Sequence, residues 1–265
     1  MKILFIADIF GKAGKYAVYS QIDELKKEYK PDIIIANGEN IAGGFGITPN
    51  LASKLFHYGV DVITLGNHTF DRKEIEDYLD DNDRIIRPYN FPPGNHGRGK
   101  MVYEFDDGRK LGIAVLQGRI FMNNIDCPFR AADEVITQLR EETVNIFVDF
   151  HAETTSEKRA FGNYLDGRVS AVCGTHTHVQ TSDNQILKGG TAFITDCGMT
   201  GPHDSVIGVK TDLIVKHLIS GRRVYFSPSK QGARLQGVVV DIDDDTGYGQ
   251  NIDRLDIEVE GFRDD

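Results

Sequence analysis

The sequence has few cysteines, and their spacing excludes two kinds of stabilising centre. Cys127, Cys173 and Cys197 are the three cysteines of the 265-residue chain. They are odd in number, far apart and without a Cys-x-x-Cys spacing, so the pattern indicates neither a disulfide framework nor a thiolate zinc site. We therefore expect a protein of the reducing cytoplasm.

Positive charge is also scarce. Lys and Arg together number 30 against 40 Asp and Glu, which gives a formal net charge of −10. Affinity for nucleic acid depends largely on clustered Lys and Arg that neutralise phosphates, so a broad nucleic-acid-binding face is not expected. A local basic patch inside the fold would be the exception. A small phosphorylated substrate held by metal ions is compatible with this charge balance.

Long apolar runs are missing as well. The first run, Ile3–Ala7, is interrupted by Asp8 before it reaches the length of a secretory signal core or a membrane span. This segment therefore predicts a first buried strand, and no membrane association is expected.

The apolar runs that are present have the length of strands, and several are followed by helical patterns. This alternation is typical of an α/β protein. No repeat, low-complexity segment or linker interrupts it, so we expect a single domain over residues 1–265. The predicted strands are Ile3–Ala7, Ile33–Ala36, Val60–Leu65, Leu111–Leu116, Ile146–Phe150, Val169–Cys173 and Ala192–Thr195.

Three helices and a final hairpin complete the prediction. Apolar side chains at three- and four-residue steps predict a helix over Tyr16–Tyr29. Thr48 followed by Pro49 is typical of a helix start, and a third helix is predicted over Ala131–Glu142. Near the end of the chain, the alternating stretches Gly237–Asp241 and Ile252–Val259 flank a turn-rich acidic run and predict an antiparallel hairpin.

Polar side chains follow five of the predicted strands where each strand ends. Ligands in α/β folds bind in the crevice beyond the carboxyl ends of the strands, so these groups can converge. Carboxylate, amide and imidazole donors without thiolates suit first-row metal ions. The candidates are Asp8, Asn37-Gly38-Glu39-Asn40, Asn67-His68, His151 and the pair His176 and His178.

Each candidate also has an ordinary structural explanation. Asp8 can cap a loop, Glu39 and Asn40 can be turn residues, and His151 can be a hydrogen-bonded core histidine. The His-x-His pair is more specific. In an extended segment, residues two apart point to the same side, so both rings can face one metal cluster or each can face a different metal.

The residue types suggest roles within such a centre. A carboxylate bridges two cations more readily than an imidazole does, so Glu39 is the expected bridge. Two cations about 3.5–4 Å apart can share a hydroxide formed at neutral pH, and that hydroxide would attack phosphorus in line. His68 follows the expected ligand Asn67, so its ring can face the substrate and donate a proton to the leaving oxygen. The alternative role for His68 is to orient a ligand from outside the first coordination shell.

These residues resemble the signatures of the calcineurin-like metallophosphoesterase superfamily and, within it, the YmdB-type bacterial phosphodiesterases. The resemblance runs nearly end to end. It is carried by Asp8, Asn37-Gly38-Glu39-Asn40, Gly66-Asn67-His68-Thr69, the segment from Asp149 and His151 to Lys158, Gly174-Thr175-His176-Thr177-His178-Val179-Gln180-Thr181, and Thr195-Asp196-Cys197-Gly198-Met199-Thr200-Gly201-Pro202.

The resemblance implies a ligand set for each of two metal ions. One ion would be held by Asp8, Glu39, Asn40 and His178, and the other by Glu39, Asn67, His151 and His176. It further implies a four-layer α/β/β/α sandwich, iron as the metal with manganese or zinc as alternatives, His68 as proton donor, and hydrolysis of 2′,3′- and 3′,5′-cyclic nucleotides. A homo-oligomer is also implied.

The sequence departs from the wider superfamily at two places. The usual Asp-x-His start is here Asp8-Ile9-Phe10, and the second block is Asn37-Gly38-Glu39-Asn40 instead of Gly-Asp-x-x-Asp. These departures weaken an assignment as a general protein phosphatase. Exchanging a histidine for Asn40 replaces a nitrogen ligand by a harder amide oxygen, which changes metal preference.

Two other functions and four other features stay open. The same motifs fit a metal-containing regulatory module that senses a nucleotide, or a nuclease acting on RNA. Arg119 can clamp a phosphate, although a structural ion pair is the favoured role. Thr200 and His203 can line the same crevice or belong to a tight turn. The acidic run Asp241–Asp245 is interpreted as a solvated turn because it lacks the glutamate of an EF-hand loop.

Overall fold

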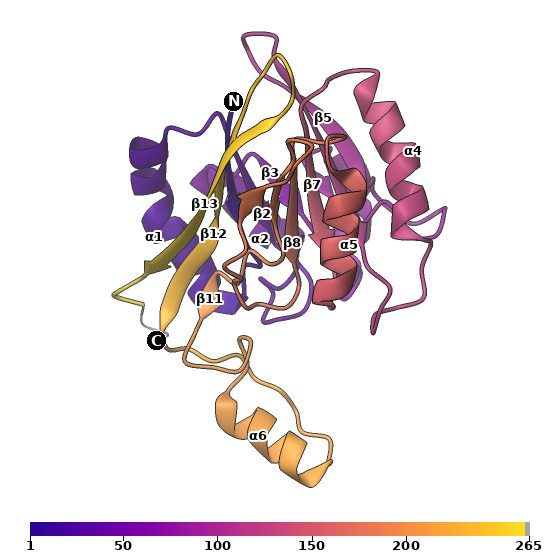
Figure 1. Ribbon diagram of the computed structural model, residues 1–265. Coiled ribbons are helices and arrows are strands. Elements are labelled where there is room, and N and C mark those ends of the chain that lie inside the picture. The colour runs from indigo at the N-terminus through magenta and orange to yellow at the C-terminus, as the bar shows by residue number, and fades with distance from the viewer. Residues whose placement is uncertain (263–265) are drawn as a thin grey trace.

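The computed structural model describes residues 1–262, and its strands form two sheets (Figure 1). The first sheet has the order β11-β12-β1-β2-β3-β4, with β13 paired to β12, and the second has the order β5-β6-β7-β8-β10-β9. The first sheet consists of β1 (Lys2–Ile6), β2 (Ile33–Asn37), β3 (Val62–Thr64), β4 (Ile85–Ile86), β11 (Gly201–Pro202), β12 (Ala233–Ile242) and β13 (Gly249–Glu258). The second consists of β5 (Lys100–Glu104), β6 (Lys110–Gln117), β7 (Ile146–His151), β8 (Ala171–Thr175), β9 (Gln185–Ile186) and β10 (Ala192–Ile194).

Helices cover the outer faces of both sheets. In Figure 1, α1 lies beside the first sheet, α4 and α5 lie beside the second, and α6 projects away from both. The helices are α1 (Gly11–Tyr29), α2 (Pro49–Tyr58), α3 (Glu76–Asp81), α4 (Pro128–Arg140), α5 (Thr155–Leu165) and α6 (Thr211–Ser220), with a short 3₁₀ helix, η1, at Lys73–Ile75.

Three apolar clusters separate these layers. One lies between α1, α2 and the first sheet, a second lies between the two sheets, and a third lies between the second sheet and α4 with α5. In the middle cluster, the rings of Phe5 and Phe147 from opposite sheets have centroids 5.1 Å apart. Full burial of each ring contributes about 1.5–3 kcal/mol. The four-layer α/β/β/α sandwich that the resemblance implied is confirmed.

The predicted helices are present with shifted ends. Helix α1 begins at Gly11, five residues before the predicted start at Tyr16. Its first turns bury small residues, and a Cβ on Gly14 would lie 2.2 Å from the carbonyl oxygen of Thr200. Small residues give no apolar stripe, so periodicity did not reveal this part of the helix. The third helix likewise begins earlier, at Pro128, and ends at Arg140.

Two predictions made from local sequence patterns are confirmed, the cap of a helix and the C-terminal hairpin. The Thr48 hydroxyl accepts a hydrogen bond from the backbone N–H of Leu51 at 3.3 Å, so Thr48 caps α2 as predicted. The C-terminal hairpin is also confirmed, since β12 and β13 pair antiparallel. Its acidic connection is a turn, in which the Asp243 carboxylate accepts from the backbone N–H groups of Asp245 and Thr246.

The strand directions place the candidate residues at one edge of each sheet. Strands β1, β2 and β3 are mutually parallel, and so are β6, β7 and β8. Their carboxyl ends therefore lie at the same end of each sheet, where Asp8, Glu39 and His151 follow or end a strand. Within residues 1–262, the helices fall short of the length and apolar character needed to cross a lipid bilayer.

Candidate metal centre

The structure brings the predicted ligands from five strand ends into one region. Asp8, Glu39 and His151 are completely withdrawn from solvent, and Asn40 is 2% exposed. Burying ionisable groups is costly unless they are paired or coordinate a metal. Their close contacts form two groups, which share Glu39.

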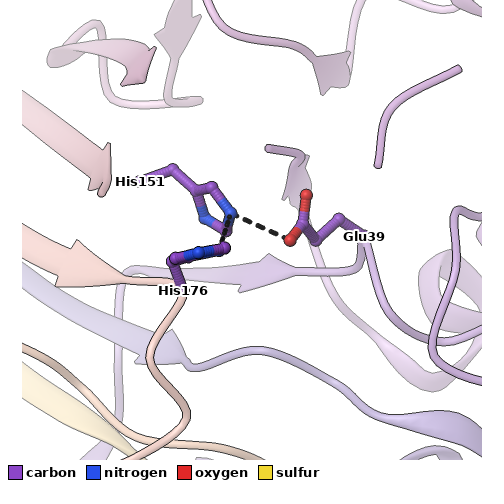
Figure 2. A group of neighbouring side chains, drawn as sticks. All are labelled: Glu39, His151 and His176. Atoms are coloured by element: carbon purple, nitrogen blue, oxygen red, sulfur yellow. Dashed lines mark hydrogen bonds and ion pairs between the residues drawn. The ribbon is translucent and has the colours of Figure 1, made fainter. Parts of the chain in front are cut away.

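The first group consists of Glu39, Asn67, His151 and His176. The Nε2 atom of His151 lies 2.9 Å from Oε1 of Glu39, 2.9 Å from Oδ1 of Asn67 and 3.1 Å from Nδ1 of His176. Figure 2 shows the rings of His151 and His176 and the Glu39 carboxylate turned toward one another. One ligand atom from each of these three residues lies within 4.8 Å of the others, which is a spacing that can hold a metal ion.

The second group consists of Asp8, Asn40 and His178. The side-chain amide nitrogen of Asn40 lies 3.2 Å from Nε2 of His178 and 3.5 Å from Oδ1 of Asp8. The same nitrogen lies 3.2 Å from Oε1 of Glu39. A half-turn of this amide would put its oxygen, a cation ligand, in almost the same place. Glu39 thus touches both groups, as a bridging carboxylate must.

Each of the three histidines has one ring nitrogen occupied by the protein. The Thr175 hydroxyl donates to Asp149 at 2.6 Å, so it accepts from Nδ1 of His151, 2.9 Å away. In His178, Nδ1 lies 3.0 Å from the carbonyl oxygen of Ile207. A carbonyl oxygen can only accept, so Nδ1 of His178 is the donor. These bonds turn each Nε2 toward the centre, where it can ligate a metal ion once that nitrogen carries no proton.

His176 uses the opposite nitrogen. Its Nε2 lies 3.1 Å from Oε2 of Glu153, and its Nδ1 faces His151. Burial, followed by the charge of His151, lowers the pKa of His176 to about 3. The ring is therefore neutral over the physiological pH range and keeps a lone pair for a cation.

The segment that carries both histidines is bent, which corrects one premise of the sequence analysis. Strand β8 ends at Thr175, and His176 and His178 have φ values of 97° and 62°. Such values are uncommon for residues other than glycine and cost energy that functional sites often contain. The pair is therefore not an extended His-x-His, and each ring faces a different donor group.

The two buried carboxylates of the centre, Asp8 and Glu39, have histidines as their basic neighbours. Among the residues that the structure describes, no Lys or Arg forms an ion pair with Asp8 or Glu39. Burial favours the neutral acid, but the charge and the hydrogen bond of His151, together with His68, outweigh it and lower the pKa of Glu39 to about 2. Burial also opposes a charge on His151, yet Glu39 raises the pKa of that ring to about 9. These carboxylate and imidazole donors together form a set that can bind metal cations.

Gly66 makes room for this centre. A Cβ on Gly66 would lie 2.4 Å from Oε2 of Glu39 and 2.4 Å from Nε2 of His151. No side chain fits at that distance, so the backbone before Asn67 can approach the ligands only because residue 66 is glycine.

Asp149 is a supporting residue whose role the sequence did not indicate. Its carboxylate accepts hydrogen bonds from Asn37 on β2, Thr64 on β3 and Thr175, at 3.1, 2.6 and 2.6 Å. Burial raises the pKa of Asp149 to about 6. These bonds join the two sheets beneath the centre. The motif that carried the resemblance contained Asp149, but no local pattern revealed its partners.

A buried ion pair supports the segment with His176 and His178. The Nζ atom of Lys158 on α5 lies 2.5 Å from Oδ2 of Asp196, and both side chains are 1% exposed. The same carboxylate oxygen accepts from the backbone N–H and the hydroxyl of Thr177, at 3.1 and 2.7 Å. Lys158 and Asp196 both belong to the motifs that carry the family resemblance, but the sequence did not show that they form an ion pair.

A cavity of about 360 Å³ opens beside the ligands. His68 lines it, with Nδ1 2.7 Å from Oδ2 of Asp71 and its ring edge-on to Phe45. The backbone N–H of His68 also donates to Oε2 of Glu39 at 3.0 Å. His68 therefore borders the ligand cluster and the cavity. The other wall includes Ile214 and Phe226 from the segment around α6.

Three further residues have structural contacts. Thr200 is fully buried, and its hydroxyl donates to the carbonyl oxygen of Gln236 at 2.9 Å. Nε2 of His203 lies 2.9 Å from the carbonyl oxygen of Met199. The prediction of an ion pair for Arg119 is wrong, since Arg119 pairs with no Asp or Glu within residues 1–262. Its guanidinium instead contacts the sulfur of Cys127 at 3.4 Å.

Known proteins of similar sequence and structure cover nearly the whole chain. The family described as "YmdB-like protein" matches residues 4–255. A curated relative from Bacillus subtilis strain 168, "2′,3′-cyclic-nucleotide 2′-phosphodiesterase", is 48% identical over 255 residues and 96% of each chain. A solved structure of a hypothetical protein from Thermus thermophilus has a TM-score of 0.91 and 39% identity, over 97% of this chain and 99% of that one. A novel phosphatase from Mycoplasma pneumoniae has a TM-score of 0.92 and 36% identity, over 97% and 93%.

Proposed function

The chain belongs to the YmdB-like protein family, and from that premise we propose that it is a metal-dependent phosphodiesterase that hydrolyses nucleoside 2′,3′-cyclic phosphates. The name of the relative from Bacillus subtilis supports this substrate class. Nucleoside 3′,5′-cyclic phosphates are the second class that we propose, because the same in-line chemistry opens either ring.

The donor groups would hold two cations. Asp8, Asn40 and His178 would hold one, Asn67, His151 and His176 the other, and Glu39 would contact both. Iron is the proposed ion, with manganese or zinc as alternatives, since amide oxygen, carboxylate and imidazole donors without thiolates suit these metals. When bound, two such cations supply a nucleophile by lowering the pKa of water to about 7.

The cavity supplies a place for the nucleotide. Its volume of about 360 Å³ lies within the range of small-molecule sites. Glu39, His176 and His178 border it on one side, where the phosphate would lie. Phe45 and Phe226 also line the cavity, and their rings offer apolar surface for the base.

His68 is the proposed proton donor to the leaving ribose oxygen. The Asp71 carboxylate holds Nδ1, which leaves Nε2 as the nitrogen that can reach the substrate. Proton transfer by a positioned side chain contributes about 10²–10⁴-fold to a rate. Since His68 follows Asn67 directly, the turn that would present Asn67 to a metal ion also fixes the backbone of His68.

The observation that carries the proposal is the contact of one carboxylate, Glu39, with both donor groups. The test is to load the purified chain with iron or manganese and measure hydrolysis of an aryl phosphodiester and a cyclic nucleotide. We expect turnover of both and its loss in Glu39→Gln, while Glu142→Gln on the far surface keeps it. Turnover in Glu39→Gln would reject the bridge.

A further inference from the structure

A second cavity adjoins the one beside the metal centre. It has a volume of about 510 Å³, and both cavities are lined by Gly43, Ser227 and Pro228. The two cavities are therefore neighbours, and the second is the nearest place for a part of the ligand that extends beyond the metal centre.

The charge of the second cavity is opposite to that of the chain. Its charged lining residues are Lys12, Lys15, Lys210 and Lys230, and within residues 1–262 no Asp or Glu lines it. The whole chain has a net charge of −10. Across the described part of the chain, neither Lys15 nor Lys210 forms an ion pair. We call this site the lysine cavity.

Two further features favour an anionic group in the lysine cavity. Helix α1 begins at Gly11, which lines the cavity, so the positive end of the helix dipole lies there. Phe262 and Leu51 add apolar surface, and the volume exceeds that of a phosphate alone. Lysines beside an aromatic ring are the combination that binds single-stranded nucleic acid by its phosphates and bases.

We infer that the lysine cavity binds a second phosphate of the substrate, and that the preferred substrate is a short oligonucleotide ending in a 2′,3′-cyclic phosphate. The inference rests on the proposed function and narrows its substrate class. In the reaction, an oxygen from water bonds to the terminal phosphorus, the bond from phosphorus to one ribose oxygen breaks, and that oxygen takes a proton. The second phosphate is unchanged and only holds the substrate.

The experiment compares three substrates on the full, manganese-loaded chain. They are adenosine 2′,3′-cyclic phosphate, the same nucleotide with a 5′-phosphate, and an adenosine dinucleotide ending in a 2′,3′-cyclic phosphate. The variants are Lys15→Ala and Lys210→Ala, alone and together. Lys188→Ala, which removes an exposed lysine between β9 and β10, is the charge-matched control.

We expect the dinucleotide to have the highest kcat/KM. Each lysine variant should lower kcat/KM for the dinucleotide about tenfold more than for the cyclic mononucleotide, mainly through KM, because a holding contact acts equally before and in the transition state. Lys188→Ala should match the unaltered chain on all three substrates. The advantage of the dinucleotide should also shrink as salt is added.

The other outcomes separate the possible failures. If the 5′-phosphate alone raises kcat/KM as much as the second nucleotide does, the second phosphate site stands but the preference for an oligonucleotide is overturned. Equal kcat/KM for all three substrates, or lysine variants that behave like Lys188→Ala, overturns the inference while the proposed function stands. Failure to hydrolyse any of the three overturns the proposed function itself.

Discussion

Oε1 of Glu39 lies 2.9 Å from Nε2 of His151, and both side chains are fully buried. The two groups come from different sheets, so this contact joins the sandwich at the place where the ligands converge. In the protein without metal it is an ion pair, because the pKa of His151 is raised to about 9 and that of Glu39 is lowered to about 2. A cation would replace the proton that they share.

Metal binding should therefore release a proton from His151. A ring with a pKa of about 9 is protonated at pH 7, whereas a ligand ring must be neutral. The affinity for manganese should rise with pH and level off above about pH 9. Calorimetric titrations in two buffers of different ionisation enthalpy measure the release. Release that is absent at pH 7, or that does not diminish above pH 9, would contradict the ion pair.

Thr175→Val should weaken metal binding at His151. The change removes the hydroxyl that links Nδ1 of His151 to Asp149, and loss of such a supporting bond typically costs about 10–100-fold in metal affinity. Thr64→Val is the matched control, because Thr64 also donates to Asp149 but does not contact His151. Competition with a chelator measures the affinity. Equal losses in both variants would show that only the packing of Asp149 matters.

His68→Ala should lower kcat by about 10²–10⁴-fold while the metal content stays unchanged. The ring lies beside the cavity, and only its backbone N–H touches Glu39. His57→Ala, an exposed position on α2, should keep full activity. Metal analysis and turnover are measured on the same samples. A regulatory module would instead keep its nucleotide affinity and its downstream effect in this variant, and loss of metal would favour an orienting role.

Gly66→Ala should disrupt the centre with little other damage. The new methyl carbon would lie 2.4 Å from Glu39 and His151, so the ligands must move apart. We expect the metal content to fall below half of that of the unaltered chain. Gly112→Ala in β6 is the control, because its nearest neighbours lie 3.3 Å away and the centre is remote. Full metal content in Gly66→Ala would show that the ligands are less confined than the structure indicates.

Lys158→Met should destabilise the fold by about 3–5 kcal/mol, because Asp196 would keep a buried charge without its partner. The pair Lys27 and Glu24 is exposed, so Lys27→Met should leave stability unchanged. Urea unfolding of both variants gives the comparison. A small effect of Lys158→Met would mean that Asp196 is protonated or hydrated when the lysine is absent.

Sequence reasoning anticipated most of the parallel framework, and its errors have physical causes. The strands around Ile3–Ala7 and Ile146–Phe150 were evident because buried parallel strands are continuous apolar runs. The start of α1 was missed because its small residues pack by close approach instead of by an apolar stripe. Short strands such as β9 and β11 depend on their neighbours and have little pattern of their own.

The sequence by itself determined which side chains stand at the strand ends, since the alternation of apolar runs and polar turns is a local property of the chain. Tertiary structure alone decided that Glu39 meets His151, that Asp149 joins the sheets and that Lys15 and Lys210 share a cavity. These residues lie from 85 to nearly 200 positions apart in the chain, and local periodicity carries no information about such distances.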